Sequence, residues 1–328
     1  MGRERVLKPQ KRISIKPVLI VQHSPHDHPA ILLRALMTQG IPILWIHPYK
    51  GDSYPQVKEI SGVISLGGPM GANDEKIHPW ISRELKVLKQ SIESGLPTTG
   101  VCLGGQLMAR AMGGRVEKNP VSEIGWFPIE VNSLGTTDRV AGVAGGTPTV
   151  YHWHADTFHL PKDAELLASS LACPRQIFRM GKHAYGFQFH PEADHQLILE
   201  WLSHHEIDDD IARAQAEHGV KTVQNKEMQK KNSTVGEKSS QAITAAIGNL
   251  FRPGAYEPIN CEYHDEIESW STLKKTVVVE TRSDPKLTLR GKITTTITIP
   301  GAEFLILQDE KTMHWPIRLD DIEKIIAV

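Results

Sequence analysis

The stretch TTGVCLGGQLMARAMGG, residues 98–114, passes from an apolar segment into an amphipathic one through a single cysteine set between glycines. Residues 96–101 predict a strand, and the apolar side chains after Cys102 recur at helical spacing. Neighbouring glycines relieve crowding where a backbone turns sharply. The stretch therefore predicts a strand that runs directly into a helix, with Cys102 at the turn. Two interpretations of Cys102 are open at this point, a small buried thiol and a nucleophile held up by the turn.

The same alternation of short β-branched runs and longer amphipathic runs extends over the N-terminal part of the chain. Strands are predicted at residues 17–22, 42–48 and 62–68, helices at 29–40, 78–95 and 195–205, and further strands between 127 and 190. Strands alternating with helices indicate a parallel sheet covered on both faces. Ligands gather at the carboxyl ends of such strands, where both Cys102 and the Gly67–Gly68 pair fall.

Composition limits the classes of partner and compartment. The 328 residues carry 37 basic and 38 acidic side chains, a net charge of −1, which provides no global field for nucleic acid or an anionic membrane. Three separated cysteines show no zinc spacing and favour a reducing, cytosolic setting. The sequence has no apolar run of the roughly 18–20 residues that span a bilayer, and its start lacks the apolar core of a signal peptide. We therefore expect a cytoplasmic protein without direct nucleic-acid or membrane partners.

The chain divides into segments of different character. Residues 1–16 form a basic tail, 17–252 an α/β domain, and 255–328 a small, mainly β module. Within the first domain, about 208–240 is polar and is compatible with either a linker or a poorly anchored helix. Residues 241–251 repeat apolar side chains at helical spacing, and we expect this stripe to pack back on the first domain.

The chemistry of a nucleophilic thiol requires a base and a group that orients the base. A helix N-terminus favours the thiolate, and its free N–H groups could hold an oxyanion. The segment FQFHPE, 187–192, supplies an apolar strand that ends in His190, followed two positions later by Glu192. The order of the predicted catalytic residues is therefore Cys102, His190, Glu192.

Three ordered motifs give the chain its resemblance to a known family. They are G-x-C-x-G-x-Q at Gly100, Cys102, Gly104 and Gln106, H-P-E at His190 to Glu192, and a strand followed by Gly-Gly-Pro at SLGGPMGAND, 65–74. Together they resemble the class I, or triad-type, glutamine amidotransferase domain over about residues 17–250. A packing role for Cys102 needs none of these motifs, so the nucleophile interpretation is favoured.

This resemblance implies a flavodoxin-like open, mostly parallel sheet and a set of roles. Cys102 attacks the side-chain amide of glutamine, His190 moves protons and Glu192 orients His190. Ammonia and then glutamate leave through a thioester, without a cofactor. The N–H groups of Gly68 and Leu103 form the oxyanion hole.

The same resemblance places Gln106 in the glutamine pocket. Gly105 departs from many relatives, where a bulkier residue stands, and this puts the shape of the pocket in doubt.

The segment YHWHADTFHLP, 151–161, allows several interpretations. His152, His154 and Asp156 alternate, as ligands of a zinc ion could, although we expect no metal. The segment is similar to the H-G-D segment of the guanylate-synthase branch of the family, which implies that His154 and Asp156 bind substrate. Asp156 could equally cap a turn. Glu123 and Trp126 in SEIGWFPIEV, 122–131, are further candidates for the pocket, although a Trp after a Gly more often belongs to the core.

Residues 255–328 resemble the Rho-binding antiterminator family, small proteins with one helix and an Sm-like β-barrel. The resemblance is carried by YEPINCEYHDEIE, 256–268, and HWPIRLDDIEKI, 314–325. With 13 acidic and 9 basic side chains, the module suits a basic protein surface better than nucleic acid. A solvated acidic face on a generic barrel is the alternative. The candidate contacts for Rho are Asp265, Glu266, Glu268, Asp320 and Asp321.

The predicted function follows from what the motifs contain and what they lack. No phosphate loop S-G-G-x-D-S follows Phe251, and no P-loop is present, so this sequence shows no means of activating an acceptor with ATP. We expect a glutamine amidotransferase that hydrolyses glutamine and delivers ammonia to a partner, such as a synthetase subunit. The alternatives are a hydrolase of γ-glutamyl compounds without an acceptor, and a glutamine sensor that acts on transcription termination.

Overall fold

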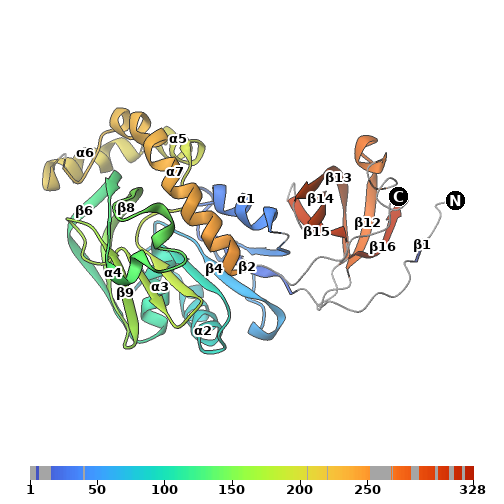
Figure 1. The fold of residues 1–328 in the computed structure, drawn as a ribbon, viewed down its shortest axis with the longest axis horizontal. Coiled ribbons are helices and arrows are strands. Elements are labelled where there is room, and N and C mark those ends of the chain that lie inside the picture. Colours follow the sequence, from blue (N-terminus) through green and yellow to red (C-terminus); the bar gives the residue numbers. More distant parts are fainter. Residues whose placement is uncertain are drawn as a thin grey trace.

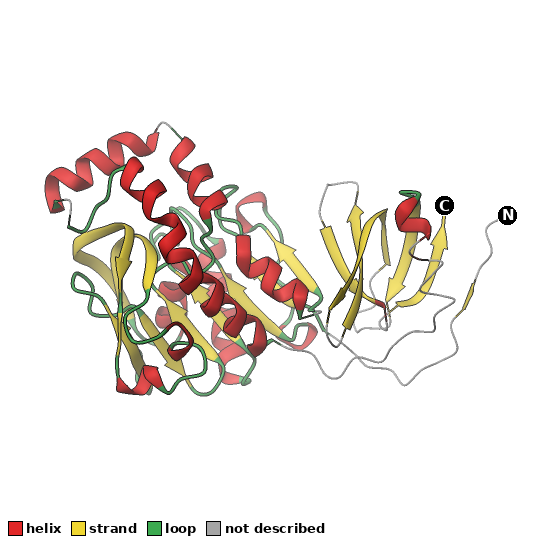
Figure 2. Ribbon diagram, turned by 45° about the horizontal axis from the view of Figure 1, so that its top comes forward, coloured by secondary structure: helices red, strands yellow, loops and turns green. Residues whose placement is uncertain are grey.

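The structure is a computed structural model. It describes residues 5–6, 16–39, 41–204, 206–219, 221–251, 267, 269–281, 288–299, 302–309, 314–319 and 322–328. Two sheets with separate cores organise these residues, and a two-stranded sheet joins the larger one (Figures 1 and 2).

The larger sheet has eight strands in the order β3-β2-β4-β5-β11-β10-β9-β7. The first five pair in parallel and the last three in antiparallel. Their bounds are β2 Val18–Val21, β3 Ile43–Ile46, β4 Gly62–Ser65, β5 Thr98–Val101, β7 Glu130–Val131, β9 Ala164–Ser169, β10 Ile177–Met180 and β11 Ala184–Phe187. The mostly parallel α/β fold predicted from the alternating runs is confirmed.

Helices cover both faces of this sheet, because alternate residues of each buried strand point to opposite sides. On β2, Val18 and Ile20 pack in one core cluster, whereas Leu19 and Val21 pack in the other. The helices are α1 Ala30–Thr38, α2 Trp80–Glu93, α3 Leu103–Ala111, α4 Ser133–Thr136, α5 His195–Ser203, α6 Glu206–His218 and α7 Lys226–Leu250. Short 3-10 turns lie at Pro48–Lys50, Val57–Glu59 and Gly142–Ala144.

Most of the described residues in the polar segment at about 208–240 are helical, and buried side chains such as Gln229 and Ser233 anchor the second helix. The segment contributes most of α6 and the first half of α7. The apolar stripe at the end of α7, with Ile243, Ile247 and Leu250, packs in the same core cluster as α1, as expected (Figure 1).

A two-stranded antiparallel sheet stands beside the main sheet and was only partly predicted. It pairs β6 Arg115–Pro128 with β8 Thr149–His159. The sequence predicted β8 in part but not β6, because a register shift between Lys118 and Glu123 interrupts the alternation.

The second sheet is antiparallel and has the order β1-β16-β12-β13-β14-β15. Its strands are β1 Arg5–Val6, β12 Thr276–Thr281, β13 Thr288–Ile299, β14 Ala302–Asp309, β15 His314–Arg318 and β16 Ile322–Ala327. Strand β1, inside the predicted tail, pairs with β16. An antiparallel C-terminal unit therefore exists, whereas the Sm-like barrel and the Rho-binding resemblance stay predictions.

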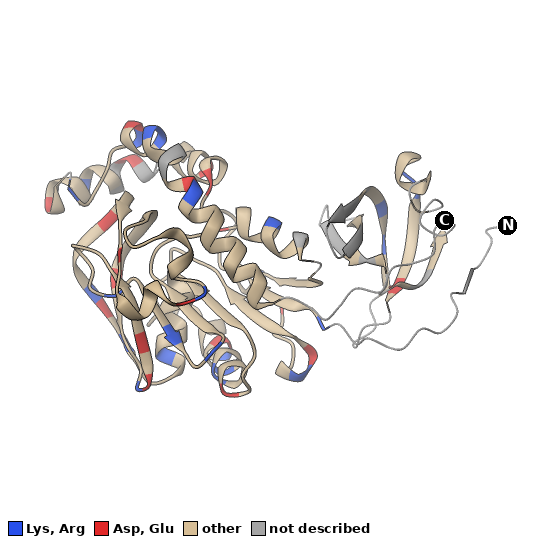
Figure 3. Ribbon diagram, viewed as in Figure 1, with Lys and Arg blue, Asp and Glu red and all other residues tan. Residues whose placement is uncertain are grey.

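Charge is distributed in keeping with the near-zero net value. Along the described ribbon, Lys and Arg are interspersed with Asp and Glu (Figure 3). Within the described ranges, we find no helix with both the length and the apolar character required to cross a bilayer.

Candidate active site

Cys102 lies at the turn between β5 and α3, as the opening stretch predicts. Its φ is 48° and its ψ is −105°, a conformation that a residue with a side chain rarely adopts. The N–H of Cys102 donates to the carbonyl oxygen of Phe187 on β11 at 2.8 Å. A Cβ added at Gly104 would lie 2.1 Å from the carbonyl oxygen of Ser65. The glycine therefore allows the close approach that holds the turn.

His190 and Glu192 reach the same edge of the sheet, because β11 pairs in parallel with β5 and ends beside it. The Nδ1 of His190 is 2.8 Å from the Oε1 of Glu192, and both side chains are buried. Burial opposes the charge on His190. The charge of Glu192 and hydrogen bonds to Cys102 and Glu192 nevertheless raise the pKa of His190 well above its ordinary value. The structure thus brings the three predicted catalytic residues together.

The two predicted oxyanion residues also meet beside Cys102. A Cβ added at Gly67 would lie 2.9 Å from Cε1 of His190 and 3.8 Å from Cβ of Cys102, and one at Gly68 would lie 3.0 Å from a methyl group of Leu103. Leu103 is the first residue of α3, where an N–H has no acceptor within the helix. Gly68 and the free N–H of Leu103 at the start of α3 thus lie on the same side of the turn as the thiol.

Two other residues of α3 face the core. Gln106 is buried and does not line the described cavity at the thiol. A Cβ at Gly105 would lie 2.6 Å from the carbonyl oxygen of Phe187. Gly105 thus determines how closely α3 approaches β11, and a bulkier residue would displace backbone.

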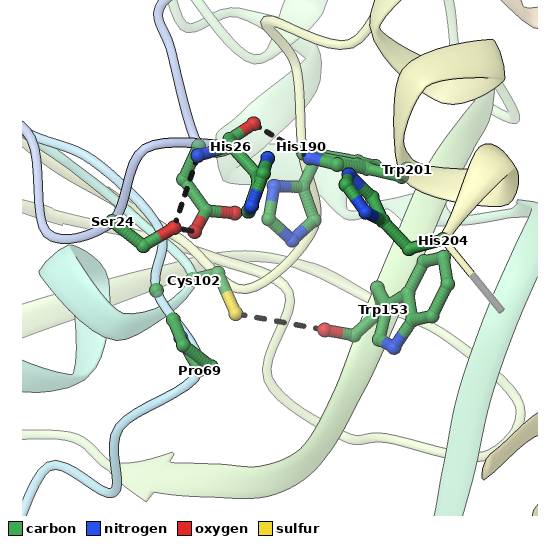
Figure 4. Close-up of a pocket in the computed structure, with 10 residues that line it drawn as sticks. Ser24, His26, Pro69, Cys102, Trp153, His190, Trp201 and His204 are labelled. Atoms are coloured by element: carbon green, nitrogen blue, oxygen red, sulfur yellow. Dashed lines mark hydrogen bonds between the residues drawn. The ribbon is translucent and has the colours of Figure 1, made fainter. Parts of the chain in front are cut away.

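A cavity of about 360 Å³ opens over Cys102 and His190 (Figure 4). This volume falls within the range of small-molecule sites. The Sγ of Cys102 lies 3.7 Å from the carbonyl oxygen of Trp153. The cavity is lined by Ser24, His26, Asp27, Gly68, Pro69, Cys102, Trp153, His190, Trp201 and His204.

Comparisons with known proteins agree with this geometry. The model of the family described as glutamine amidotransferase class-I matches residues 30–205. This chain belongs to the class I glutamine amidotransferase family. The glutamine amidotransferase-like protein YfeJ of Salmonella typhimurium is 30% identical over 210 residues, 63% of this chain and 87% of that protein.

Other relatives of this amidotransferase are larger enzymes or solved structures. A GMP synthase of Caldanaerobacter subterraneus is 34% identical over 46% of this chain, but the match spans only 28% of the synthase. The crystal structure of a glutamine amidotransferase from Methylobacillus flagellatus superposes with a TM-score of 0.66 and 27% identity, covering 75% of this chain and 100% of the other. A second, from Thermotoga maritima, has a TM-score of 0.63 at 23% identity and supports the fold alone.

Sequence reasoning missed much of the wall of the amidotransferase cavity. His26 and Asp27 follow β2, Trp153 lies on β8, and Trp201 and His204 lie at α5. The Nε1 of Trp201 donates to the carbonyl oxygen of His26 at 2.8 Å. The ring centroids of His26 and His204 are 4.2 Å apart. The rule that ligands lie at the carboxyl ends of parallel strands could have identified the loop after β2.

His154 and Asp156, the other residues predicted to bind substrate, lie on the face of β8 opposite Trp153. Because side chains alternate along β8, His152 and His154 point away from Trp153, which lines the cavity. Asp156 forms an ion pair with Lys118 at 2.7 Å. Neither His154 nor Asp156 is among the described residues that line the cavity.

Glu123, His152 and His154 form a buried cluster. It differs from the zinc site considered from the sequence in having Glu123 in place of Asp156. The ligand atoms of the three residues lie within 4.8 Å of one another, close enough to share a metal ion. Nε2 of His154 is 3.1 Å and Nδ1 of His152 is 3.7 Å from Oε2 of Glu123. The Glu123 carboxylate also accepts hydrogen bonds of 2.7 Å from both Ser170 and Gln176. Its charge is therefore compensated by protein donors.

The ionisation of this cluster follows from burial and the neighbouring groups. Burial opposes the charge on Glu123, but the hydrogen bond from His154 and the nearby imidazoles lower the pKa of Glu123 to about 2. Burial lowers the pKa of His152 to about 4 despite the attraction of Glu123. Glu123 is thus ionised and His152 neutral at neutral pH.

The five candidate contacts for Rho, Asp265, Glu266, Glu268, Asp320 and Asp321, lie outside the described residues.

Proposed function

We propose that this amidotransferase hydrolyses the side-chain amide of glutamine, or of a related γ-glutamyl compound, through a thioester on Cys102. The observation that carries the proposal is the His190–Glu192 pair, buried beside a thiol on a strained turn that opens into a cavity. This arrangement suits Cys102 as nucleophile, His190 as base and Glu192 as the group that orients the base.

The steps use only residues at this edge of the sheet. The Cys102 sulfur attacks the amide carbon, and the N–H groups of Gly68 and Leu103 receive the developing oxyanion. His190 takes the proton of the Cys102 thiol and gives it to the leaving nitrogen, so that the C–N bond breaks and ammonia departs. Water, deprotonated by His190, then attacks the thioester carbon, the C–S bond breaks to release glutamate, and His190 returns the proton to the Cys102 sulfur.

The fate of the ammonia is a separate part of the proposal. The match to GMP synthases, of which this chain spans just over a quarter, supports delivery of ammonia to a synthetase partner. The second candidate is hydrolysis of γ-glutamyl compounds without an acceptor, which fits a sequence that shows no phosphate loop for activating one. Release of free ammonia by the protein alone, at the same rate with and without candidate acceptors, would favour the second.

The direct test compares Cys102→Ala with Cys173→Ala in assays of glutamine and γ-glutamyl amides. Cys173 is a matched control, because its buried thiol contacts the hydroxyl of Thr157 and does not line the cavity. We expect Cys102→Ala to abolish release of ammonia and glutamate and Cys173→Ala to retain it. Unchanged turnover by Cys102→Ala would refute the mechanism.

A labelling experiment separates an enzyme from a glutamine sensor. A glutamine analogue that alkylates thiols should modify Cys102 in a stoichiometric and glutamine-protected manner. Protection by glutamine without any turnover would instead support the sensor, which acts by binding.

A further inference from the structure

A second buried histidine–glutamate pair lies behind the predicted oxyanion loop. His23 follows β2, Glu84 lies on α2, and neither side chain reaches solvent. The Nε2 of His23 is 2.9 and 3.1 Å from the two carboxylate oxygens of Glu84. The proposed catalytic steps leave this pair without a role.

The other nitrogen of His23 contacts the peptide that joins Gly67 to Gly68. Nδ1 of His23 is 3.0 Å from the carbonyl oxygen of Gly67. That carbonyl belongs to the same planar unit as the N–H of Gly68, and in a trans peptide the two groups point in opposite directions. A hydrogen bond that holds the Gly67 carbonyl therefore also fixes the direction of the Gly68 N–H.

Packing on both sides leaves this peptide little freedom. A Cβ at Gly68 would lie 2.8 Å from Cβ of His23, and one at Gly67 would lie 2.9 Å from the ring of His190. The peptide is thus enclosed between His23 and the catalytic residues. Glycine at both positions allows this close approach.

The hydrogen-bond partners of His23 suit an imidazolium. The Gly67 carbonyl and an ionised Glu84 can only accept hydrogen bonds, so both ring nitrogens of His23 must carry hydrogen. Glu84 also accepts from the hydroxyls of Ser65 at 2.6 Å and Tyr54 at 2.8 Å, which satisfies its carboxylate.

The surroundings favour the same ionised pair. Burial opposes both charges. The charge of Glu84 and its hydrogen bond nevertheless raise the pKa of His23, and the charge of His23 and its hydrogen bond lower the pKa of Glu84. Asp27 adds a further negative charge near His23, and the Trp80 ring stacks on the imidazole with 5.1 Å between centroids. The pair of an imidazolium and a carboxylate is therefore the favoured state of His23 and Glu84.

We propose that His23, held by Glu84, positions and polarises the Gly67–Gly68 peptide so that the Gly68 N–H stabilises the oxyanion formed on attack by Cys102. The inference rests on the proposed amide hydrolysis. His23 is a positioning residue, since it acts through the peptide and does not line the described cavity.

This role predicts a specific kinetic signature. An oxyanion donor interacts with the transition state more than with bound substrate, so its weakening lowers kcat and leaves KM nearly unchanged. Loss of one such donor typically lowers kcat by about 10²–10³-fold. Loss of the positioning bond should lower kcat by roughly tenfold to a hundredfold, because the Gly68 N–H itself remains.

Two substitutions of His23 distinguish the hydrogen bond to the Gly67 carbonyl oxygen from the hydrogen bond to the side chain at position 84. The amide nitrogen of Asn can occupy the place of Nδ1, whereas that of Gln approximates Nε2 and loses the bond to Gly67. Both His23→Asn and His23→Gln are made together with Glu84→Gln, so that no unpaired carboxylate is left buried. The Glu84→Gln single variant is the parent for both proteins, and His159→Gln controls for a His→Gln change in a partly exposed pair with Glu117, away from the cavity.

Alkylation of Cys102 by iodoacetamide provides the reference reaction, because it needs the thiol but forms no oxyanion. We expect the double variant His23→Gln with Glu84→Gln to have a lower kcat for amide hydrolysis, while its rate of alkylation at Cys102 stays within about twofold of the wild-type rate. The His23→Asn protein should recover much of kcat, and His159→Gln should match the wild type.

The other outcomes overturn the inference in distinguishable ways. Equal kcat in the Asn and Gln proteins, or alkylation that falls in parallel with kcat, would show that His23 serves the fold alone. A wild-type protein that is alkylated at Cys102 but hydrolyses no amide would refute the proposed function, and this inference with it.

Discussion

At Cys102 the backbone adopts a conformation that its side chain disfavours. A φ of 48° with a ψ of −105° places a residue with a Cβ in a sparsely populated region. Such a conformation costs about 1–3 kcal/mol and persists only where surrounding contacts impose it. Here the contacts are the Cys102 N–H bonded to Phe187 and the tight approach of Gly104 to Ser65. These contacts hold the thiol at the cavity despite the strain.

The strain predicts a difference between two inactive variants. Cys102→Ala keeps a Cβ at the positive φ, whereas Cys102→Gly removes it and relieves the conflict. We expect the Gly variant to have the higher free energy of unfolding, by about 1 kcal/mol, as measured by urea denaturation. A less stable Gly variant would show that the backbone strain is small.

The triad residues were predictable at this scale because each stands in a compact motif. Cys102 lies between glycines, and His190 and Glu192 are two positions apart. His23 and Glu84 gave no such signal. They are 61 positions apart, and neither belongs to a short motif. Only the packing of α2 against the sheet brings them together.

At the scale of elements, the β6–β8 sheet carries a buried ionisable cluster whose protonation is linked to stability. The ladder places Glu123 opposite His154 and Gly125 opposite His152. His152 is fully buried with a pKa of about 4, below its ordinary value of 6.5. The unfolded chain therefore binds a proton more readily than the folded one between these two pH values.

This linkage predicts acid sensitivity. The contribution of neutral His152 is complete above pH 6.5 and is lost as pH falls toward 4, at up to roughly 1.4 kcal/mol per pH unit. Thermal unfolding should show the wild-type Tm falling across this window. The His152→Gln variant, which has no proton to bind here, should show a shallower fall. Parallel curves for the two proteins would contradict the assignment.

Helix α7 shows why a real helix can resemble a linker in the sequence. The buried face of its first half carries polar or small residues, among them Gln229, Ser233 and Gly236. Gln229 accepts a hydrogen bond from the Tyr151 hydroxyl at 2.6 Å, and a Cβ at Gly236 would lie 1.9 Å from the Trp126 ring. Without an apolar stripe, hydrophobic periodicity could not distinguish the alternatives.

At the scale of the whole molecule, two sheets have cores that share no residue. One core cluster of the larger sheet includes Ile247 on α7, and the core of the second sheet includes Val279 on β12. Both side chains are completely buried. We propose on this basis that the two sheets are separately cooperative domains.

Matched core truncations test this division. Replacement of a buried Ile by Ala typically costs about 2–5 kcal/mol, and Val→Ala should cost somewhat less because fewer atoms are removed. In calorimetry we expect Ile247→Ala to lower one unfolding transition and Val279→Ala to lower another. Their effects should add, because the two residues belong to core clusters that share no residue. A single transition shifted by both substitutions would contradict independent cores.

The sequence by itself determined the α/β class, the turn at Cys102 and the motif at His190 and Glu192. These features are local, since periodicity encodes strands and helices, and a short motif encodes a turn. The tertiary structure decided which side of each strand faces the cavity, and therefore that Trp153 and not His154 lines it. One residue of register reverses the face of every side chain. It also decided the His23–Glu84 contact, because pairing between distant segments leaves no periodic trace in the chain.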